Sequence, residues 1–434
     1  MPLPPVCHHE RLQLDVSDFA DEAGFVRLPV QRRIAATTSS GRVIKTRQND
    51  SEDISAFPGP LVLPDDELAL DPRHPPQSLR SWIQEKERNP VTQDRKTIYV
   101  GHVPQIEADI SIMKRWTTPA ASPVHPNHAA TTVPPRSLDG EHVREYLEAF
   151  YHGLPVKPLK KPFSFVSWNK VKSGQVPDHV GLRMGSSCVQ IRTRPCPDKV
   201  FPRQLNLNDI LDAMIEALPQ DAYSVLLLLD HDLYEDDDDD FCCGRAYGGS
   251  RVAVVSTARY HPALDPTADL DHAHMWPASH CQDYVDKQID TGIRRQVPKA
   301  TAQTGPIGAA VQAASTTPSW DTELYGLWLS RVARTASHEL GHCLALDHCV
   351  YYACVMQGAA GIGEDVRQPP YLCPVCTSKV SRAISSLDEN ASANNSPKEG
   401  YRALANYCHK WNHIGMFAGF GAWLDAMLDS GLAT

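Results

Sequence analysis

The segment from Thr335 to Met356 reads TASHELGHCLALDHCVYYACVM and contains most of the residues that decide the fold. His338 and His342 are four residues apart, so on a helix both imidazoles project from one face, one turn apart, as two ligands of a tetrahedral zinc ion. Glu339 lies in the same turn and can act as general base toward water that the metal activates. For these five residues alone, the alternative is a solvated helix with incidental His and Glu.

His348 follows His342 by six residues, where metzincin proteases place their third ligand. Ten residues of helix turn through about 1000°, so His348 cannot share the face of the other two histidines. We therefore expect the chain to leave the helix between residues 342 and 348. Metzincins have a glycine in this turn, whereas this sequence has Ala345, and alanine with positive φ costs about 1 kcal/mol relative to glycine.

A second group of candidate ligands follows at once. Cys373-Pro-Val-Cys376 is a Cys-x-x-Cys pair, a common half of a tetrathiolate zinc site, and Cys349 with Cys354 supplies the other half. The alternative is four free thiols. Because Cys349 directly follows His348, a zinc ion on the cysteines would fix the loop that carries the third histidine.

Taken together, His338-Glu339-x-x-His342, His348-Cys349, Cys354-x-Met356 and Cys373-x-x-Cys376 resemble the archaemetzincin family of zinc metallopeptidases, in its eukaryotic branch. The resemblance extends discontinuously over residues 81–100 and 140–385. By position it implies two zinc ions per chain and a role for each of these residues. The implied roles are catalytic zinc ligands for His338, His342 and His348, catalytic base for Glu339, structural zinc ligands for Cys349, Cys354, Cys373 and Cys376, and the Met-turn residue for Met356.

The family resemblance also implies the fold class, an α/β (α+β) architecture. It implies a metzincin-like, twisted mixed sheet with an antiparallel edge strand, flanking helices, an active-site helix and a four-cysteine zinc subsite. Apolar and β-branched runs predict strands at 97–100, 225–230 and 251–258. Helical periodicity predicts helices at 78–89, 141–151, 207–218 and 324–345. An edge strand offers unpaired backbone groups to an extended peptide.

The composition of the 434 residues indicates where the chain is divided into parts. The 35 prolines cluster in polar stretches, which are typical of loops and linkers. We expect a loop at 300–318. The predicted parts are a poorly ordered N-terminal extension (1–77), the N-terminal part of the catalytic region (78–205) with a flexible insertion at 113–136, a metzincin-like core with two zinc sites (206–385), and a linker with a C-terminal helix (386–434).

Charge and hydropathy exclude several classes of partner. The net charge is −10, which argues against nucleic acid, and no stretch approaches the ~20 apolar residues of a membrane span. Met1–Pro5 lacks the features of a secretory signal, so we expect an intracellular protein, cytoplasmic or nuclear, with reduced thiols.

Two polar clusters stand apart from the zinc motif. The acidic run Glu235–Asp240 is expected to be a solvated loop, with a site that favours basic peptides near the cleft as the alternative. His272, His274 and His280 lie near two aspartates, but their spacing matches no known metal cage, so we do not expect a metal there.

The sequence therefore predicts a zinc metallopeptidase that hydrolyses peptide bonds of a peptide or protein substrate, with Glu339 assisting the attack of water. The family suggests aminopeptidase action, although nothing in the sequence marks a pocket for a free amino terminus. The alternative is a non-catalytic, zinc-organised interaction protein with a vestigial three-histidine site. The intact histidines and Glu339 argue against it. The oligomeric state is not predicted.

Overall fold

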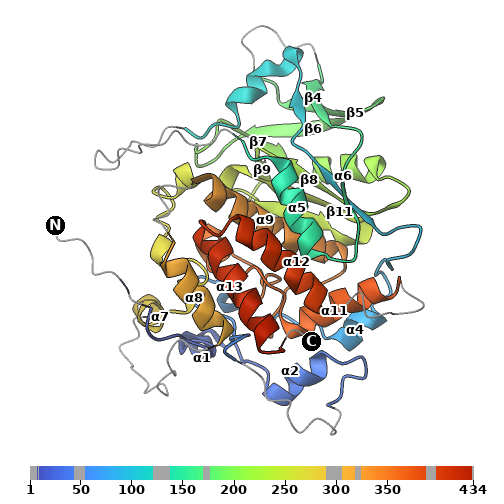
Figure 1. The fold of residues 1–434 in the computed structure, drawn as a ribbon. Helices are drawn as coiled ribbons and strands as arrows, with labels where there is room; N and C mark the ends of the chain where they lie inside the picture. Colours follow the sequence, from blue (N-terminus) through green and yellow to red (C-terminus); the bar gives the residue numbers. More distant parts are fainter. Residues whose placement is uncertain are drawn as a thin grey trace, which may run out of the picture.

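The computed structural model describes residues 7, 9–43, 54–120, 137–169, 176–289, 305–317, 324–387 and 397–432. These residues form an α/β molecule in which two sheets lie above a layer of helices in the orientation of Figure 1. The candidate site lies where the first sheet meets the helices.

The first sheet has five strands in the order β10-β11-β8-β1-β3. Four of them run parallel, and β10 pairs antiparallel with β11 at one edge. The predicted mixed sheet with an antiparallel edge strand is therefore confirmed. The strand bounds are β1 Thr97–Gly101, β3 Val156–Pro158, β8 Ala222–Leu229, β10 Gly244–Tyr247 and β11 Val252–Ser256.

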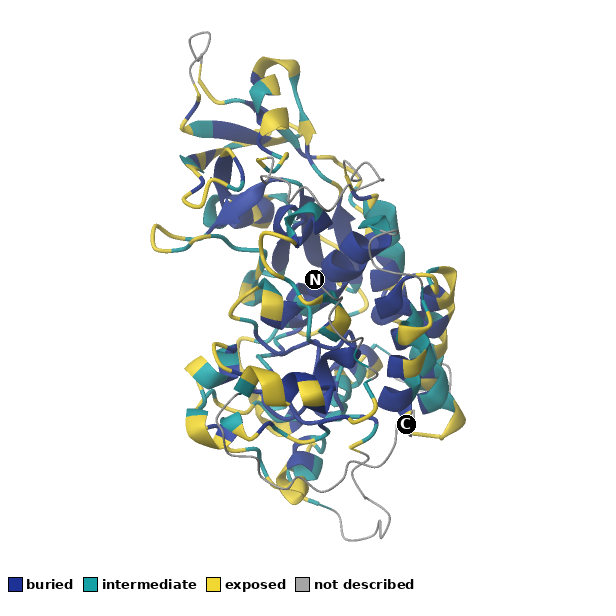
Figure 2. Ribbon diagram, turned by 90° about the vertical axis from the view of Figure 1, so that its left-hand side faces the viewer, coloured by how far each residue is buried: buried dark blue, intermediate teal, exposed yellow. Residues whose placement is uncertain are grey.

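Side chains of β8 alternate between two hydrophobic cores. Leu226 and Leu228 face the core that contains α5 (Gly140–Phe150) and α9 (Leu324–Cys343), whereas Leu227 and Leu229 face the core that contains α6 (Leu207–Ala217). Because both faces of the sheet are covered, the parallel strands are apolar along their whole length. Figure 2 shows this buried layer in the middle of the molecule.

A second, six-stranded sheet was not predicted. Its order is β2-β4-β5-β6-β7-β9, with parallel pairs only at the two ends, β2 with β4 and β7 with β9. β6 is largely exposed and polar, so it lacks the apolar alternation that marks a strand in sequence. The bounds are β2 Gln105–Ile106, β4 Ser164–Ser167, β5 His179–Met184, β6 Ser187–Pro195, β7 Arg203–Asn206 and β9 Asp232–Tyr234.

The C-terminal region differs from the prediction. Instead of one helix after residue 386, α12 (Pro397–Lys410) and α13 (Gly415–Asp429) pack against each other and continue the core around α5 and α9. The predicted loop at 300–318 contains α8 (Pro306–Ser315), whose alanine-rich sequence favours helix and packs against α13. α11 (Pro374–Ser385) begins within the Cys-x-x-Cys pair, with Cys373 at its N-cap and Cys376 in its first turn.

The prediction of a poorly ordered extension over 1–77 is wrong for the residues that the structure describes. Four short helices occur here and just beyond: α1 (Phe19–Ala23), α2 (Val30–Ala36), α3 (Glu67–Leu70) and α4 (Leu79–Gln84). Ala20, Phe25, Val62 and Leu68 form a small core with Val350. These apolar residues give no periodic signal, because the cluster combines residues from separate short segments with Val350 of a distant loop.

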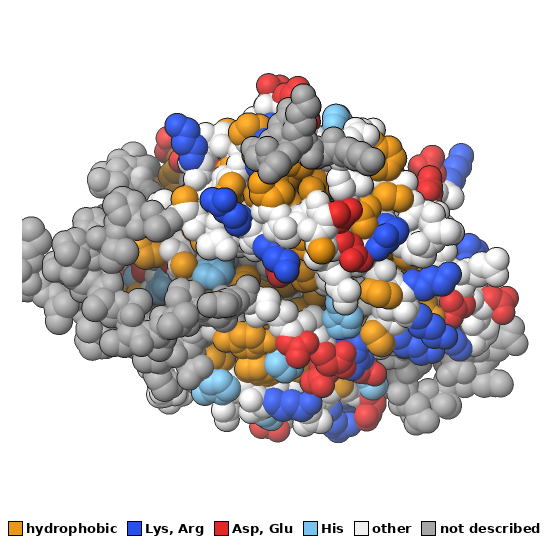
Figure 3. Space-filling model, turned by 90° about the horizontal axis from the view of Figure 1, so that it is seen from above, with side chains coloured by type: hydrophobic (Ala, Val, Ile, Leu, Met, Phe, Trp, Pro, Cys, Tyr) orange, Lys and Arg blue, Asp and Glu red, His pale blue; other side chains and the backbone are white. Residues whose placement is uncertain are grey.

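The predicted insertion at 113–136 is only partly visible. The 3₁₀ helix η1 (Ala108–Arg115) extends into it, Met113 is buried, and residues 121–136 lie outside the described part of the chain. The remaining α-helices of the described residues are α7 (Gln282–Ile289) and the short α10 (Ile362–Asp365). Within the described ranges, no helix is long and apolar enough to cross a membrane. On the upper face, basic and acidic side chains are interspersed among the coloured residues (Figure 3).

Candidate functional site

The helix α9 carries the His-Glu-x-x-His segment at its C-terminal end. It packs against β10, β11 and α5, and its side chains are buried along most of its length. His338 and His342 are half-buried on the last turns, where they face a cleft of about 920 Å³. The helix therefore holds two imidazoles rigidly at the wall of an open site.

The chain leaves α9 through a left-handed turn at Ala345, as predicted. Ala345 has φ +60°, its N–H donates to the carbonyl of His342 (2.9 Å), and the N–H of Leu346 donates to the carbonyl of Gly341 (3.0 Å). These two bonds form a Schellman motif, in which glycine is the usual residue at the left-handed position. The turn brings His348 back to the other two histidines.

The three histidines converge on one point. The Nε2 atoms of His338 and His342 are 3.0 Å apart, and the ring of His348 lies 5.4 Å from that of His338 and 5.1 Å from that of His342. One ligand atom from each of the three lies within 4.8 Å of the others. This is the arrangement that a three-histidine metal site requires.

The other ring nitrogen of each histidine is already engaged. Nδ1 of His338 donates to the carbonyl of Val355, and Nδ1 of His342 donates to the carbonyl of Leu346, each at 2.7 Å. Since a carbonyl can only accept, these bonds fix the tautomer and leave Nε2 with a free lone pair. Burial lowers the pKa of His342 to about 4, which favours the neutral imidazole that binds metal. The residues present fit a zinc ion.

Glu67 orients the third histidine and was missed by the sequence analysis. Its Oε1 lies 2.7 Å from Nδ1 of His348, and its own N–H donates to a carboxylate oxygen of Glu364 at 2.9 Å. Glu67 belongs to α3, inside the predicted poorly ordered extension. Since it lies 281 residues from His348 and in no motif, no spacing signal could have identified it.

Glu339 is buried beside the histidines, with 7% of its surface exposed. Burial raises its pKa to about 8. The edge strand β10 packs directly against it, because a Cβ on Gly244 would lie 3.3 Å from Oε1 of Glu339. A carboxyl group with increased proton affinity at a reaction site suits a general base that must hold a proton.

The four cysteines form a separate, closed cluster. Cys349, Cys354, Cys373 and Cys376 are at most 3% exposed, and one sulfur from each lies within 4.8 Å of the others. The N–H groups of Cys373 and Met356 both donate to Sγ of Cys354, at 3.2 and 3.5 Å. Such N–H···S bonds stabilise thiolates, so this cluster also fits a zinc ion.

The loop between Cys349 and Met356 connects the two clusters. It begins one residue after His348, and the N–H of Cys349 donates to the carbonyl of Met356 at 2.7 Å. The carbonyl that orients His338 belongs to Val355 in the same loop. Met356 lies beneath the motif, because a Cβ on Gly341 would lie only 2.4 Å from its sulfur. The loop that carries Cys349 and Cys354 thus positions two of the three histidines.

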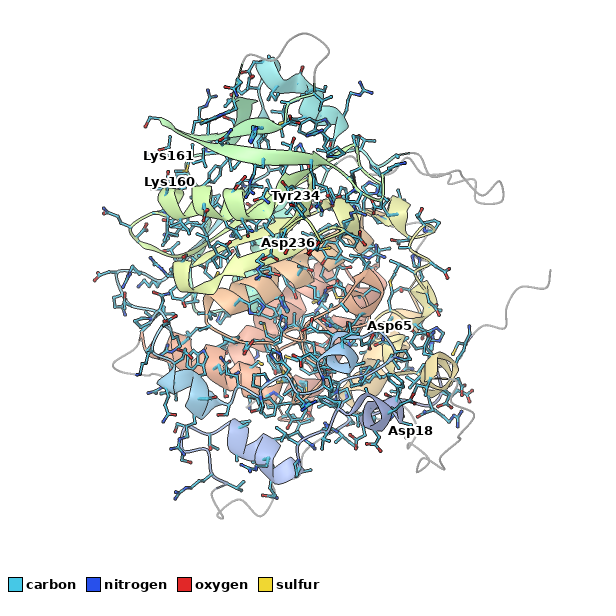
Figure 4. All side chains as sticks on the ribbon, turned by 180° about the vertical axis from the view of Figure 1, so that it is seen from behind. Asp18, Asp65, Lys160, Lys161, Tyr234 and Asp236 are labelled. Atoms are coloured by element: carbon cyan, nitrogen blue, oxygen red, sulfur yellow. The ribbon has the colours of Figure 1, made fainter. Side chains whose placement is uncertain are left out.

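The acidic run Glu235–Asp240 borders the cleft and is not merely a solvated loop. Asp238, Asp239 and Asp240 line the cleft. Arg194 holds the loop by donating to the carbonyl of Asp236 at 3.0 Å. In the view from behind, Tyr234 and Asp236 lie near the middle of the molecule (Figure 4).

Comparisons with known proteins agree with this site. The model of peptidase family M54 matches residues 303–382, which include all three histidines and all four cysteines. Archaemetzincin-2 of Rattus norvegicus is 26% identical over 246 residues, which cover 56% of this chain and 53% of that protein. Archaemetzincin-1 of Rattus norvegicus is 25% identical over 276 residues, covering 63% and 42%. The chain thus spans about half the length of the curated relatives it matches.

One solved structure is also similar in part. The crystal structure of archaemetzincin from Methanopyrus kandleri is 17% identical, with a TM-score of 0.32 over 68% of this chain and 97% of that chain. The match to the model of peptidase family M54 over residues 303–382 and the similarity to archaemetzincin-1 and archaemetzincin-2 support the predicted resemblance to the archaemetzincin family.

Proposed function

We propose that this protein is a zinc-dependent peptidase that cleaves peptide bonds in the cleft beside α9. The observation that carries the proposal is the convergence of three oriented imidazoles next to a buried carboxylic acid, at the wall of an open cleft. Under this proposal His338, His342 and His348 bind a catalytic zinc ion. The four cysteines bind a second, structural zinc ion.

Different residues of the site have different roles in the proposed reaction. A zinc ion on the three imidazoles would lower the pKa of water at the site and polarise the scissile carbonyl. Glu339, buried beside the imidazoles, accepts the proton that the attacking water loses and then returns this proton to the leaving amine. Val355, Leu346 and Glu67 keep the imidazoles in the productive tautomer.

The edge strand β10 is the proposed binding surface for the substrate backbone. It is the last strand of the first sheet, and Gly244 and Arg245 line the cleft next to Glu339. A peptide that adds to this edge as an extended strand would place a carbonyl near the histidines. The substrate is therefore a peptide or an extended segment of a protein.

The charge of the cleft favours basic substrates. Its two arginines are already paired, Arg245 with Glu235 at 2.9 Å and Arg334 with Asp365. The carboxylates of Asp238, Asp239 and Asp240 therefore leave the cleft with an excess of negative charge. We propose that side chains of Lys or Arg near the scissile bond strengthen binding, and that this preference weakens at high salt.

A cleavage assay with a diverse peptide library tests the function. Zinc-loaded protein should cleave members of the library. At low salt, peptides with Lys or Arg should be cleaved faster than matched peptides with Glu. Pairs with free and acetylated amino termini separate the two modes of action, since an aminopeptidase cleaves only the free member. Fully loaded protein that cleaves no peptide would contradict the proposal and favour a zinc-organised binding protein.

A further inference from the structure

A third cluster of candidate metal ligands lies outside the lining of the cleft, where the N-terminal segment meets the loop before α7. Cys7, His274 and Cys281 each offer one ligand atom within 4.8 Å of the others. Sγ of Cys7 and Sγ of Cys281 are 3.4 Å apart. A tetrahedral zinc ion with bonds of about 2.3 Å to sulfur holds its ligand atoms roughly 3.5–4 Å apart, so only small shifts are needed.

The Nδ1 atom of His274 is engaged by a neighbouring group, as it is in the three histidines of the cleft, and this contact orients the ring for metal binding. Its Nδ1 lies 2.7 Å from Oδ2 of Asp271, and a carboxylate at this position fixes the tautomer and raises the basicity of the ring. Its Nε2 is buried and has no hydrogen-bond partner among the described residues. The ring is stacked on Tyr284 at 4.3 Å, so it cannot easily turn toward solvent. A buried nitrogen of this kind is costly unless something binds it.

The backbone around the cluster is fixed by several contacts. Leu12 and Cys281 form an isolated β-bridge, and the N–H of Gln13 donates to the carbonyl of His280 at 2.6 Å. The N–H of Gln282 donates to the carbonyl of Arg11 at 2.9 Å. The N-terminal segment therefore runs beside Cys281 independently of the two thiols, and the three ligands come together on a scaffold that is already held.

We infer that Cys7, His274 and Cys281 bind a zinc ion, with His9 as the fourth ligand. The ring of His9 packs edge-on against that of His274, with 5.1 Å between the ring centroids. Two thiolates with imidazoles are a ligand set that zinc prefers. The ion would link the N-terminal segment to α7 and so stabilise the region from which Glu67 reaches His348.

No metal was expected here from the sequence, in which His272, His274 and His280 form one loose group. In the structure His272 pairs with Asp265, and His280 is buried against the carbonyl of Gly59. Only His274 joins the cluster. Its sulfur partner Cys7 lies 274 residues before Cys281, so no local spacing could indicate the site.

Metal content of the full chain tests this inference without any use of activity. Cys7→Ser and His274→Ala should each bind one equivalent of zinc less than wild type after equilibration with zinc and removal of the excess. Co²⁺ should give thiolate charge-transfer absorption from this site that Cys7→Ser removes. Cys7 is only half-buried, so its replacement by serine should leave the fold intact.

Two matched variants serve as controls. Cys188→Ser removes an exposed thiol, and His272→Ala removes a neighbouring imidazole, and both should keep the zinc content of wild type. Equal zinc content in wild type, Cys7→Ser and His274→Ala would overturn the inference. A Cys7–Cys281 disulfide in the purified protein, found by mass spectrometry in place of bound zinc, would overturn it as well. Because peptide cleavage is not measured, failure here leaves the proposed function untouched.

Discussion

The three-histidine cluster and the four-cysteine cluster lie on the same stretch of chain but differ in their exposure. The cysteines are almost completely buried, whereas the histidines are half-buried and border a cleft of about 920 Å³. A structural zinc site uses all four positions for protein ligands, and a catalytic site keeps one open. The contrast indicates that the exposure of the ligands to the cleft, more than the kind of metal ion, distinguishes a catalytic site from a structural one.

Removal of metal should have the largest effect and should separate the two clusters by their rates of zinc release. A hydrophilic chelator should strip the histidine-bound zinc first and abolish peptide cleavage, because the open cleft gives it access. The cysteine-bound zinc should leave at least about tenfold more slowly, since it is closed and buried. Zinc release followed with a colorimetric indicator, in parallel with activity, checks this. A single release phase for both clusters would contradict the assignment of open and closed sites.

Replacement of the proposed base tests the chemistry of the open site alone. Glu339→Gln should keep its metal, because Glu339 is not a proposed ligand and the change preserves shape. Gln cannot hold the proton, so kcat should fall by about 10²–10⁴-fold, with little change in KM. Zinc content and steady-state kinetics of both proteins provide the measurement. Equal cleavage rates would show that another group is the base.

Loss of one cysteine ligand tests whether the closed site supports the open one. Cys373→Ser should lower the free energy of unfolding by about 4 kcal/mol or more, in the range that is exceptional for point mutations and typical of a lost metal. Activity should fall too, because the 349–356 loop positions His348 and His338. Denaturant unfolding is the measurement. Cys408→Ser, a buried cysteine outside the cluster, is the control and should be much milder.

The two clusters and the helix that carries them could be predicted because their signals are local. The pattern from His338 to Cys376 spans less than forty residues, and with His348 taken as the third ligand, helical geometry required the chain to leave the helix between residues 342 and 348, where Ala345 makes the turn. Glu67 could not be predicted, because its role depends on a contact between distant segments. The second sheet was missed for a related reason: polar β6 is a strand through its pairing with β5 and β7, and not through its own pattern.

Glu67 offers a finer test, since it acts on the open site from a segment outside the motif. Glu67→Gln replaces the carboxylate that faces Nδ1 of His348 with a weaker acceptor. Outer partners of this kind typically contribute about 10–100-fold to metal affinity or activity, so we expect zinc affinity to fall by that factor. Competition with a zinc buffer measures it. Asp65→Asn, an equal charge change at an exposed neighbour, should have no such effect.

The smallest expected effect concerns the turn that delivers His348. Ala345 occupies the left-handed position of the Schellman motif with φ +60°, where an L-residue with a Cβ is strained and glycine is not. Ala345→Gly should relieve this strain, while glycine also increases the entropy of the unfolded chain, so the net gain in unfolding free energy should be about 0.5–1 kcal/mol. The carbonyl of Ala345 accepts from Nε2 of Gln77 at 3.0 Å, a bond that glycine can keep. Since the turn itself is unchanged, zinc content and kcat should remain those of wild type. A stabilised variant with lower zinc affinity would instead show that strain at residue 345 holds His348 in its binding position.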